Sequence, residues 1–236
     1  MINLAVALLA AALVVAVLAG AVHLGLWASL LPGLAVLVGV YLWRSRVTLA
    51  KVKKIMDGMQ KDLQAGRVEK AIESLQAAFP LAGQQFLLGS QLHAALGVLL
   101  YTNKDFDAAL PHLQRAFFRD WQAQATLGAL LFKREDYAGM EKAFEKAVVS
   151  GKKEGLAWSA YAWCLEKAGM RSKAQRVLMR AVEANPSDER LKSNLVALQN
   201  DKRLKMKAYE PQWFQFHLER PPPEMTGGRR VVWQRR

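Results

Sequence analysis

The first 43 residues of this 236-residue chain contain no aspartate, glutamate, lysine or arginine. All 33 basic and 20 acidic residues therefore lie after Trp43. Apolar stretches of 18 or more residues without charges are typical of transmembrane helices and are rare on the surface of a soluble domain. The uncharged region and the rest of the chain must therefore be interpreted separately.

Cysteine is almost absent, since Cys164 is the only one. One thiol cannot form an internal disulfide, and it excludes a metal site built from several cysteines. Because it falls on an apolar helical pattern, we expect Cys164 to be a small buried side chain. The four histidines are scattered without a second ligand at metal spacing, and we expect His93 and His112 to be ordinary polar residues on helix faces.

Motifs of catalysis are also lacking. The chain has no phosphate-binding glycine loop, no nucleophile elbow and no helix with paired metal ligands. Glu135 and Asp136 form a polar turn rather than a pair of catalytic carboxylates. We therefore expect no catalytic residue, no cofactor and no metal, and a protein that is not an enzyme.

The uncharged region consists of two apolar blocks, residues 4–22 and 26–43. As helices they would be about 28 and 27 Å long at 1.5 Å per residue, close to the roughly 30 Å of a hydrocarbon core. Gly20 and Gly25 lie where a tight connection is needed. The sequence predicts a transmembrane hairpin within residues 1–46.

This region has two other interpretations. A cleaved signal peptide is disfavoured because no basic residue precedes the apolar core and because the apolar region is too long. A single long, tilted span with the remainder re-entrant stays open as an alternative.

The net charge of +13 is concentrated near the two ends of the charged part of the chain. Five basic residues directly follow the apolar region: Arg44, Arg46, Lys51, Lys53 and Lys54. Such a cluster is retained on the cytoplasmic side and attracts anionic lipid. We expect an inner (cytoplasmic) membrane protein with both termini and the remaining chain facing the cytoplasm.

The middle of the chain repeats itself. In three successive segments a small residue in one helical run is followed by a regularly spaced apolar series in the next. The series after Gly97, Gly128 and Ala162 are Phe106, Ala109, Leu113 and Ala116; Tyr137, Met140, Phe144 and Ala147; and Ala174, Leu178, Ala181 and Pro186. A degenerate earlier unit has Ala71, Leu75 and Ala78. Corresponding positions recur after 31 residues, from Ala109 to Met140, and after 34 residues, from Met140 to Ala174. Self-similarity at this spacing indicates stacked helix pairs.

This pattern resembles the tetratricopeptide repeat (TPR) family, whose repeats are helix pairs of about 34 residues. Trp158, Ala174, Ala181 and Pro186 match the family well, whereas Met140 and Gln124 depart from it. The first two units also lack the closing proline. The resemblance implies a helix-pair solenoid over residues 47–201. A polar helix following the capping residues Ser187, Asp188 and Glu189 would close it.

The resemblance also implies a groove lined by the first helix of each pair. The corresponding residues are Ala94, Val98, Tyr101, Ala125, Ala129, Phe132, Ser159 and Trp163. Members that hold a partner's terminal carboxylate use lysine, arginine and asparagine there, and this chain lacks them. A small apolar groove suits a partner helix or an extended hydrophobic segment. Alternatively, the three aromatic residues simply fill a tightly wound core.

The last region, residues 202–236, breaks the helical period because of Pro211 and the prolines at 221–223. Its candidate contact residues are Trp213, Phe214, Phe216, Arg229, Arg230, Trp233, Arg235 and Arg236. The first three either dock on the repeats and fill the groove or insert at the membrane interface. The arginines around Trp233 suit anionic lipid, RNA or an acidic protein, and a solvated tail is the remaining alternative.

Together these observations predict an all-α protein: a transmembrane hairpin, a TPR-like solenoid with a capping helix, and an irregular tail. We expect a membrane-anchored adaptor or scaffold that binds protein partners, with membrane lipid as a further partner. The alternatives are a structural subunit of a larger membrane complex and, with weaker support, nucleic-acid binding through the basic tail. Homo-oligomerisation stays open.

Overall fold

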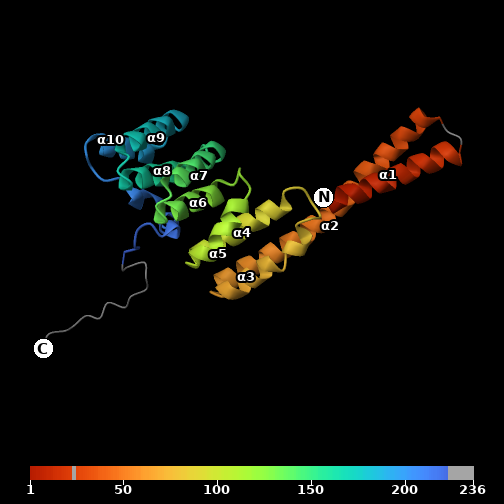
Figure 1. The fold of residues 1–236 in the computed structure, drawn as a ribbon, viewed down its shortest axis with the longest axis horizontal. Coiled ribbons are helices and arrows are strands. Elements are labelled where there is room, and N and C mark those ends of the chain that lie inside the picture. The colour runs from red at the N-terminus through yellow and green to blue at the C-terminus, as the bar shows by residue number, and fades with distance from the viewer. Residues whose placement is uncertain (23–24, 223–236) are drawn as a thin grey trace. The chain divides into compact units, whose positions relative to one another are not determined.

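A computed structural model describes residues 1–22 and 25–222 of the chain. These residues are entirely helical or irregular, with no strand among them (Figure 1). They divide into two compact units. Unit 1 comprises Met1–Asn103 and Asp107–Phe117, and unit 2 comprises Lys104–Phe106 and the chain from Phe118 onward.

Unit 1 begins with a helical hairpin, in which α1 (Ile2–Gly20) runs antiparallel to the first half of α2 (Leu26–Gln64). Both helices are long and apolar enough to cross a membrane, judged by length and composition. Ala11 is buried, and a Cβ atom added at Gly33 would collide with the Val15 side chain. The two helices therefore approach closely because these positions are small.

Helix α2 is 39 residues long and continues without interruption past residue 46, where the sequence suggested a domain boundary. Its second half pairs with α3 (Val68–Gln76). An ion pair braces the connection, with Arg67 Nη2 lying 2.6 Å from Asp62 Oδ1. Three positions of the degenerate repeat are fully buried: Ala71, Leu75 and Ala78.

The rest of unit 1 consists of the short 3₁₀ helix η1 (Phe79–Leu81), α4 (Leu88–Thr102) and α5 (Phe106–Arg115). A Cβ atom at Gly97 on α4 would lie 2.9 Å from the Leu113 side chain on α5. This confirms that a small residue faces a large one between the paired helices, as the repeat pattern predicts.

Up to residue 222, unit 2 contains two helix pairs, a single helix and two 3₁₀ helices. The pairs are α6 (Trp121–Lys133) with α7 (Tyr137–Ser150) and α8 (Gly155–Lys167) with α9 (Arg171–Ala184). They are followed by α10 (Glu189–Gln199), η2 (Met206–Tyr209) and η3 (Gln212–Phe216). A Cβ atom at Gly128 would lie 2.5 Å from Phe144, so the small-against-large contact recurs. Phe144 in turn stacks on Tyr161, with ring centroids 5.2 Å apart. Aromatic residues therefore connect one pair to the next.

Three helices of unit 2 begin at an aspartate whose carboxylate accepts a backbone hydrogen bond from the first turn. Asp120 accepts from Ala123 N, and Asp136 accepts from Gly139 N. Asp188 accepts from Arg190 N, which confirms the capping position predicted before the final helix. That helix, α10, packs on α8 and α9.

The turns inside the three pairs share one backbone conformation. Each contains a residue with positive φ: Lys104 at 67°, Glu135 at 61° and Gly169 at 78°. These residues are spaced 31 and 34 positions apart, like the apolar series. The same helix–turn–helix unit is therefore built three times, and the described chain is an all-helical, TPR-like series of helix pairs.

Candidate functional site

The residues predicted to line a groove in unit 2 are largely inaccessible to solvent. Ala125 and Ala129 on α6 and Ser159 on α8 have no exposed surface. Trp163 on α8 is 7% exposed, and Phe132 on α6 is half-buried. Helix α8 is buried along most of its length, from Gly155 to Leu165, which is unusual for a face offered to a partner.

The covering element is residues 204–219, which follow α10 and which we call the docked segment. Trp213 packs edge-on against Trp163, with ring centroids 5.3 Å apart and planes at 67°. The largest buried side chains of the segment are Leu204, Met206, Tyr209, Trp213 and Phe216. Because each fully buried side chain of this size contributes about 1.5–3 kcal/mol, the docked segment is an integral part of unit 2.

A series of connected hydrogen bonds, most of them buried, holds the docked segment in position. The Ser159 hydroxyl donates to the Tyr209 hydroxyl over 2.9 Å, and Asn194 Nδ2 donates to Ser159 Oγ over 3.2 Å. Asn194 Oδ1 accepts from the backbone N–H of Lys205 over 2.8 Å. Burial raises the pKa of the Tyr209 phenol, so this group stays a neutral hydrogen-bonding partner.

Of the alternatives for the aromatic tail residues, docking on the repeats is the one observed. Trp213 and Phe216 are buried, and Phe214 is half-buried. Trp213 Nε1 also donates to Glu219 Oε2 over 2.7 Å, so its polar edge is satisfied. In this structure two of the predicted groove residues, Ser159 and Trp163, contact the chain's own segment. Contact of the groove with a partner stays a prediction.

The other predicted contact residues lie in unit 1 or outside the described part of the chain. In unit 1, Ala94 and Tyr101 are buried and Val98 is half-buried. Arg44 on α2 is half-buried, whereas the remaining membrane-surface residues on that helix are exposed: Arg46, Lys51, Lys53 and Lys54. The rest of the tail contact residues lie outside the described part of the chain: Arg229, Arg230, Trp233, Arg235 and Arg236.

The structure brings together two histidines that we expected to be separate polar residues. His93 Nδ1 on α4 lies 2.9 Å from His112 Nδ1 on α5, and Phe79 packs edge-on against both rings. One ring must donate to the other. Burial lowers the pKa of both imidazoles, and the nearby Arg115 guanidinium lowers it further. The sequence did not predict this pair because the two residues lie on different helices.

Nothing else in the described residues completes a chemical site around this pair. No group of three or more metal-ligating side chains occurs among residues 1–22 and 25–222. Cys164 has no exposed surface, and burial raises the pKa of its thiol, which confirms the expected small buried side chain.

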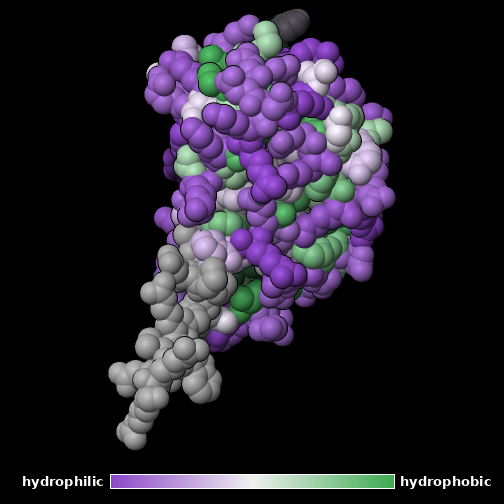
Figure 2. Space-filling model, turned by 90° about the vertical axis from the view of Figure 1, so that its left-hand side faces the viewer, coloured by the Kyte–Doolittle hydropathy of each residue, from purple (hydrophilic) through white to green (hydrophobic). Residues whose placement is uncertain are grey.

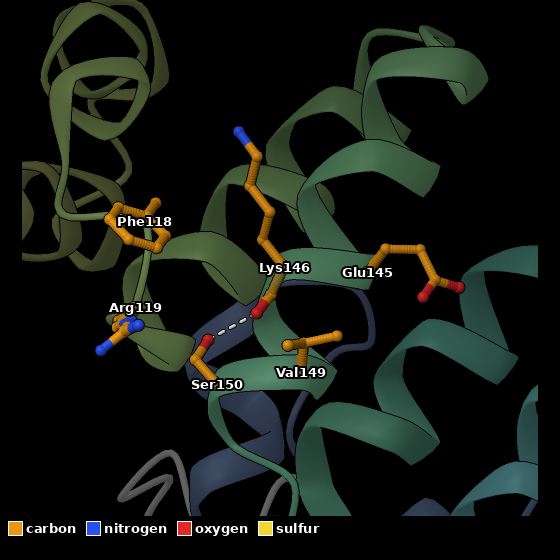
Figure 3. Close-up of a pocket in the computed structure, with 6 residues that line it drawn as sticks. All are labelled: Phe118, Arg119, Glu145, Lys146, Val149 and Ser150. Atoms are coloured by element: carbon orange, nitrogen blue, oxygen red, sulfur yellow. Dashed lines mark hydrogen bonds between the residues drawn. The ribbon is translucent and has the colours of Figure 1, made fainter.

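A cavity of about 790 Å³ lies in unit 2 beside α7 (Figure 3). Its apolar lining comes from Phe118, which precedes α6, and Val149 on α7. Their exposed fractions are 55% and 72%. Charged side chains of Arg119 and Lys146 stand at its edge.

The acidic member of this cavity, Glu145, is already engaged by Arg180 on α9. Two nearly parallel hydrogen bonds of 2.8 and 2.9 Å join their side chains. The Arg180 hydrogen bond lowers the pKa of the Glu145 carboxyl. Because the Glu145 carboxylate is paired with Arg180, the unpaired charge at the cavity comes from Arg119 and Lys146 and is positive.

No family model matches this chain, and no protein with a curated description does. One solved structure that matches it is named "MamA RS-1 ArsTM double mutant". The match has 17% sequence identity and a TM-score of 0.49, and it covers 71% of this chain and 93% of that chain.

Proposed function

We propose that this chain is a membrane-anchored helical-repeat adaptor, which holds protein partners at the cytoplasmic face of a membrane. Stacked helix pairs offer extended surfaces for binding other proteins, and such binding needs no catalytic group. Anchoring raises the local concentration of the repeats at the bilayer, which strengthens weak contacts with other membrane-associated proteins.

The observation that carries the anchoring is the solvent exposure of the hairpin. Large apolar side chains cover its outer surface: Leu4, Leu8, Leu9, Leu13, Val17, Trp27, Leu30, Leu31, Leu34, Val38, Leu42 and Trp43. By contrast, the face drawn in Figure 2 is mostly hydrophilic, with small separate hydrophobic patches. A continuous apolar surface of this extent is suited to lipid.

The basic residues on α2 support the proposed orientation. Arg44 is the first charged residue after the apolar run, and four further cations follow within residues 46–54. Clusters of this kind are retained in the cytoplasm. In this orientation the beginning of α1 and the charged half of α2 lie on the cytoplasmic side.

The surface we assign to a protein partner is the cavity beside α7. The docked segment contacts Ser159 and Trp163 on α8, whereas Val149 and Phe118 are exposed. Arg119 and Lys146 give the cavity a positive edge. These features suit a partner segment that presents an apolar side chain next to an acidic one.

Site-specific photocrosslinking in native membranes tests this function. A photoreactive residue at Val149 should give an adduct with a partner peptide that contains apolar and acidic residues, identified by mass spectrometry. The same residue at Val196 on α10, which is also exposed, serves as the matched control. Equal adducts at both positions, or adducts at Val149 with unrelated peptides only, would contradict the assigned surface.

A Lys146→Glu variant provides a second arm of this experiment. Reversing a charge at the edge of the cavity should reduce the Val149 adduct severalfold, because an acidic partner is then repelled. Membrane extraction at alkaline pH tests anchoring separately: the chain should remain in the pellet, and its release would contradict the proposal.

One observation favours the alternative of a structural subunit in a larger complex. Ala12 and Ala16 on α1 are exposed, while Ala7 and Ala11 pack inside the hairpin. Exposed small residues permit close packing against another transmembrane helix. Loss of a larger complex in an Ala12→Leu, Ala16→Leu double variant, with the Val149 adduct retained, would favour this alternative.

A further inference from the structure

The first turn of α1 is fixed to the middle of α2 by buried polar contacts. Asn3 is 1% exposed, and its Nδ2 donates to Thr48 Oγ1 over 3.0 Å. Asn3 Oδ1 accepts from Arg44 Nε over 3.2 Å. The beginning of α1 therefore lies at the level of residues 44–48 of α2.

The loop between η1 and α4, residues 82–87, is attached at this same level. The backbone N–H groups of Ile2 and Asn3 donate to the carbonyl oxygens of Gly83 and Gln84, over 2.9 and 3.1 Å. The Thr48 hydroxyl lies 3.0 Å from Gln84 Oε1. Backbone and side chains together thus hold the loop against the base of the hairpin.

This level coincides with the end of the apolar surface. Trp43 is the last residue of the uncharged region, and Arg44 is the first charge after it. Tryptophan and arginine in this order are typical of the boundary between hydrocarbon and headgroups. A loop held beside Arg44 is consequently held at the membrane surface.

The loop contributes an exposed aromatic side chain and one wall of a cavity. Phe86 is 62% exposed. Together with Met1, Leu4, Tyr41, Gln84 and Gln85 it lines a cavity of about 250 Å³. Leu4 continues into the exposed apolar face of α1, so the cavity opens onto the surface assigned to lipid. Within the described residues, the buried Gln85 Oε1 lacks a hydrogen-bond partner.

We propose that the loop of residues 82–87 is a lipid-contacting element outside the two spans. Phe86 inserts into the interfacial layer, and the acyl chain of a phospholipid fills the cavity between Leu4, Tyr41 and Phe86. The lipid phosphate lies near Arg44 and Arg46, which supply the complementary charge. This inference rests on the anchoring proposed above.

The chain is suited to a depth measurement with spin labels because Cys164 is fully buried. A Phe86→Cys variant of the full chain would therefore carry one accessible thiol. The label is placed in vesicles of phosphatidylcholine and phosphatidylglycerol, and its collisions with oxygen and with a water-soluble nickel chelate are compared. Leu9→Cys, on an exposed position of α1, and Phe118→Cys, on an exposed position of unit 2, are the two controls.

We expect the label at position 9 to collide more with oxygen than with the nickel chelate, and the label at position 86 to show the same preference less strongly. The label at position 118 should collide more with the nickel chelate. A water-like result at Phe86 together with a lipid-like result at Leu9 would overturn this inference and leave the anchor intact. Water-like results at all three positions would overturn the anchor as well.

Photoactivatable phosphatidylglycerol, with the reactive group on its acyl chain, tests occupation of the cavity. Adducts are expected on Tyr41 and on the peptide that contains Phe86, and a Phe86→Ser variant should lower the yield at Tyr41 severalfold. Adducts confined to the outer face of α1 and α2 would show that the cavity is not occupied by lipid.

Discussion

Trp213 and Trp163 meet edge to face, although 50 residues separate them in the sequence. This contact joins the docked segment to α8. Trp163 also packs edge-on against Phe132, at 5.8 Å. An aromatic cluster thus lies where the repeat pattern left room for a partner, and the chain itself fills that room.

Replacing Trp213 with alanine should destabilise unit 2 by about 3–5 kcal/mol, the usual cost of deleting a buried tryptophan. Trp213 is 1% exposed, whereas the neighbouring Gln215 is exposed. Gln215→Ala is therefore the matched control and should change stability by less than about 0.5 kcal/mol. Hydrogen exchange of the α8 amides in the full chain measures the change in stability of each variant. Equal exchange in the two variants would contradict the docking.

Tyr209→Phe should cost about 1–2 kcal/mol, because Ser159 loses its acceptor inside unit 2. The Ser159→Ala variant removes the other side of the same contact. If the two hydroxyls interact as described, the double variant should cost less than the sum of the single ones. Strict additivity in this double-mutant cycle would show that the hydrogen bond does not contribute.

Glu135→Gly should stabilise the chain by roughly 0.5–1 kcal/mol. Glu135 has φ of 61°, a conformation that costs a residue with a side chain about 1–2 kcal/mol, and the added flexibility of glycine in the unfolded chain offsets part of the gain. Gly169→Ala, at the equivalent turn with φ of 78°, should destabilise by a similar amount. Denaturant titration of both variants checks the opposite signs.

Acidification should loosen the α4–α5 pair. Burial lowers the pKa of His93 and His112 from the ordinary value of 6.5, so the folded state binds fewer protons than the unfolded state. The stability contribution of the pair is therefore complete above pH 6.5 and is lost as the pH falls toward the folded pKa.

Hydrogen exchange of the α4 and α5 amides between pH 7.5 and 5.5, corrected for intrinsic rates, measures this loss. In His112→Gln or His93→Gln variants one titrating ring is gone, and the pH dependence should be reduced in each. A wild-type chain whose protection does not change over this range would contradict the inference.

The helix pairs of this protein were predictable because they are encoded locally. Gly97 against Leu113 and Gly128 against Phe144 follow from a small residue and a large residue at fixed spacing. The turn at Glu135 and Asp136 was predictable for the same reason, and both residues lie between α6 and α7.

The docked segment and the histidine pair were not predictable in the same way. Residues 204–219 have no helical period, and their position depends on contacts with Ser159 and Trp163 far away in the sequence. His93 and His112 meet only because two helices pair. The length of α2 was also missed, because the change from apolar to charged composition near residue 44 marks a change of surroundings and not the end of a helix.

Helix α2 has a mechanical consequence for an anchored protein. At 1.5 Å per residue its 39 residues extend about 58 Å. If the hairpin is anchored as proposed, residues 44–64 leave the bilayer as one uninterrupted helix. A flexible linker would let α3 occupy many positions relative to the membrane. A continuous helix would instead keep α3 at one distance from the membrane, and any tilt or rotation of the hairpin would move α3 with it. The lipid bilayer would then set the angle at which α3 is presented.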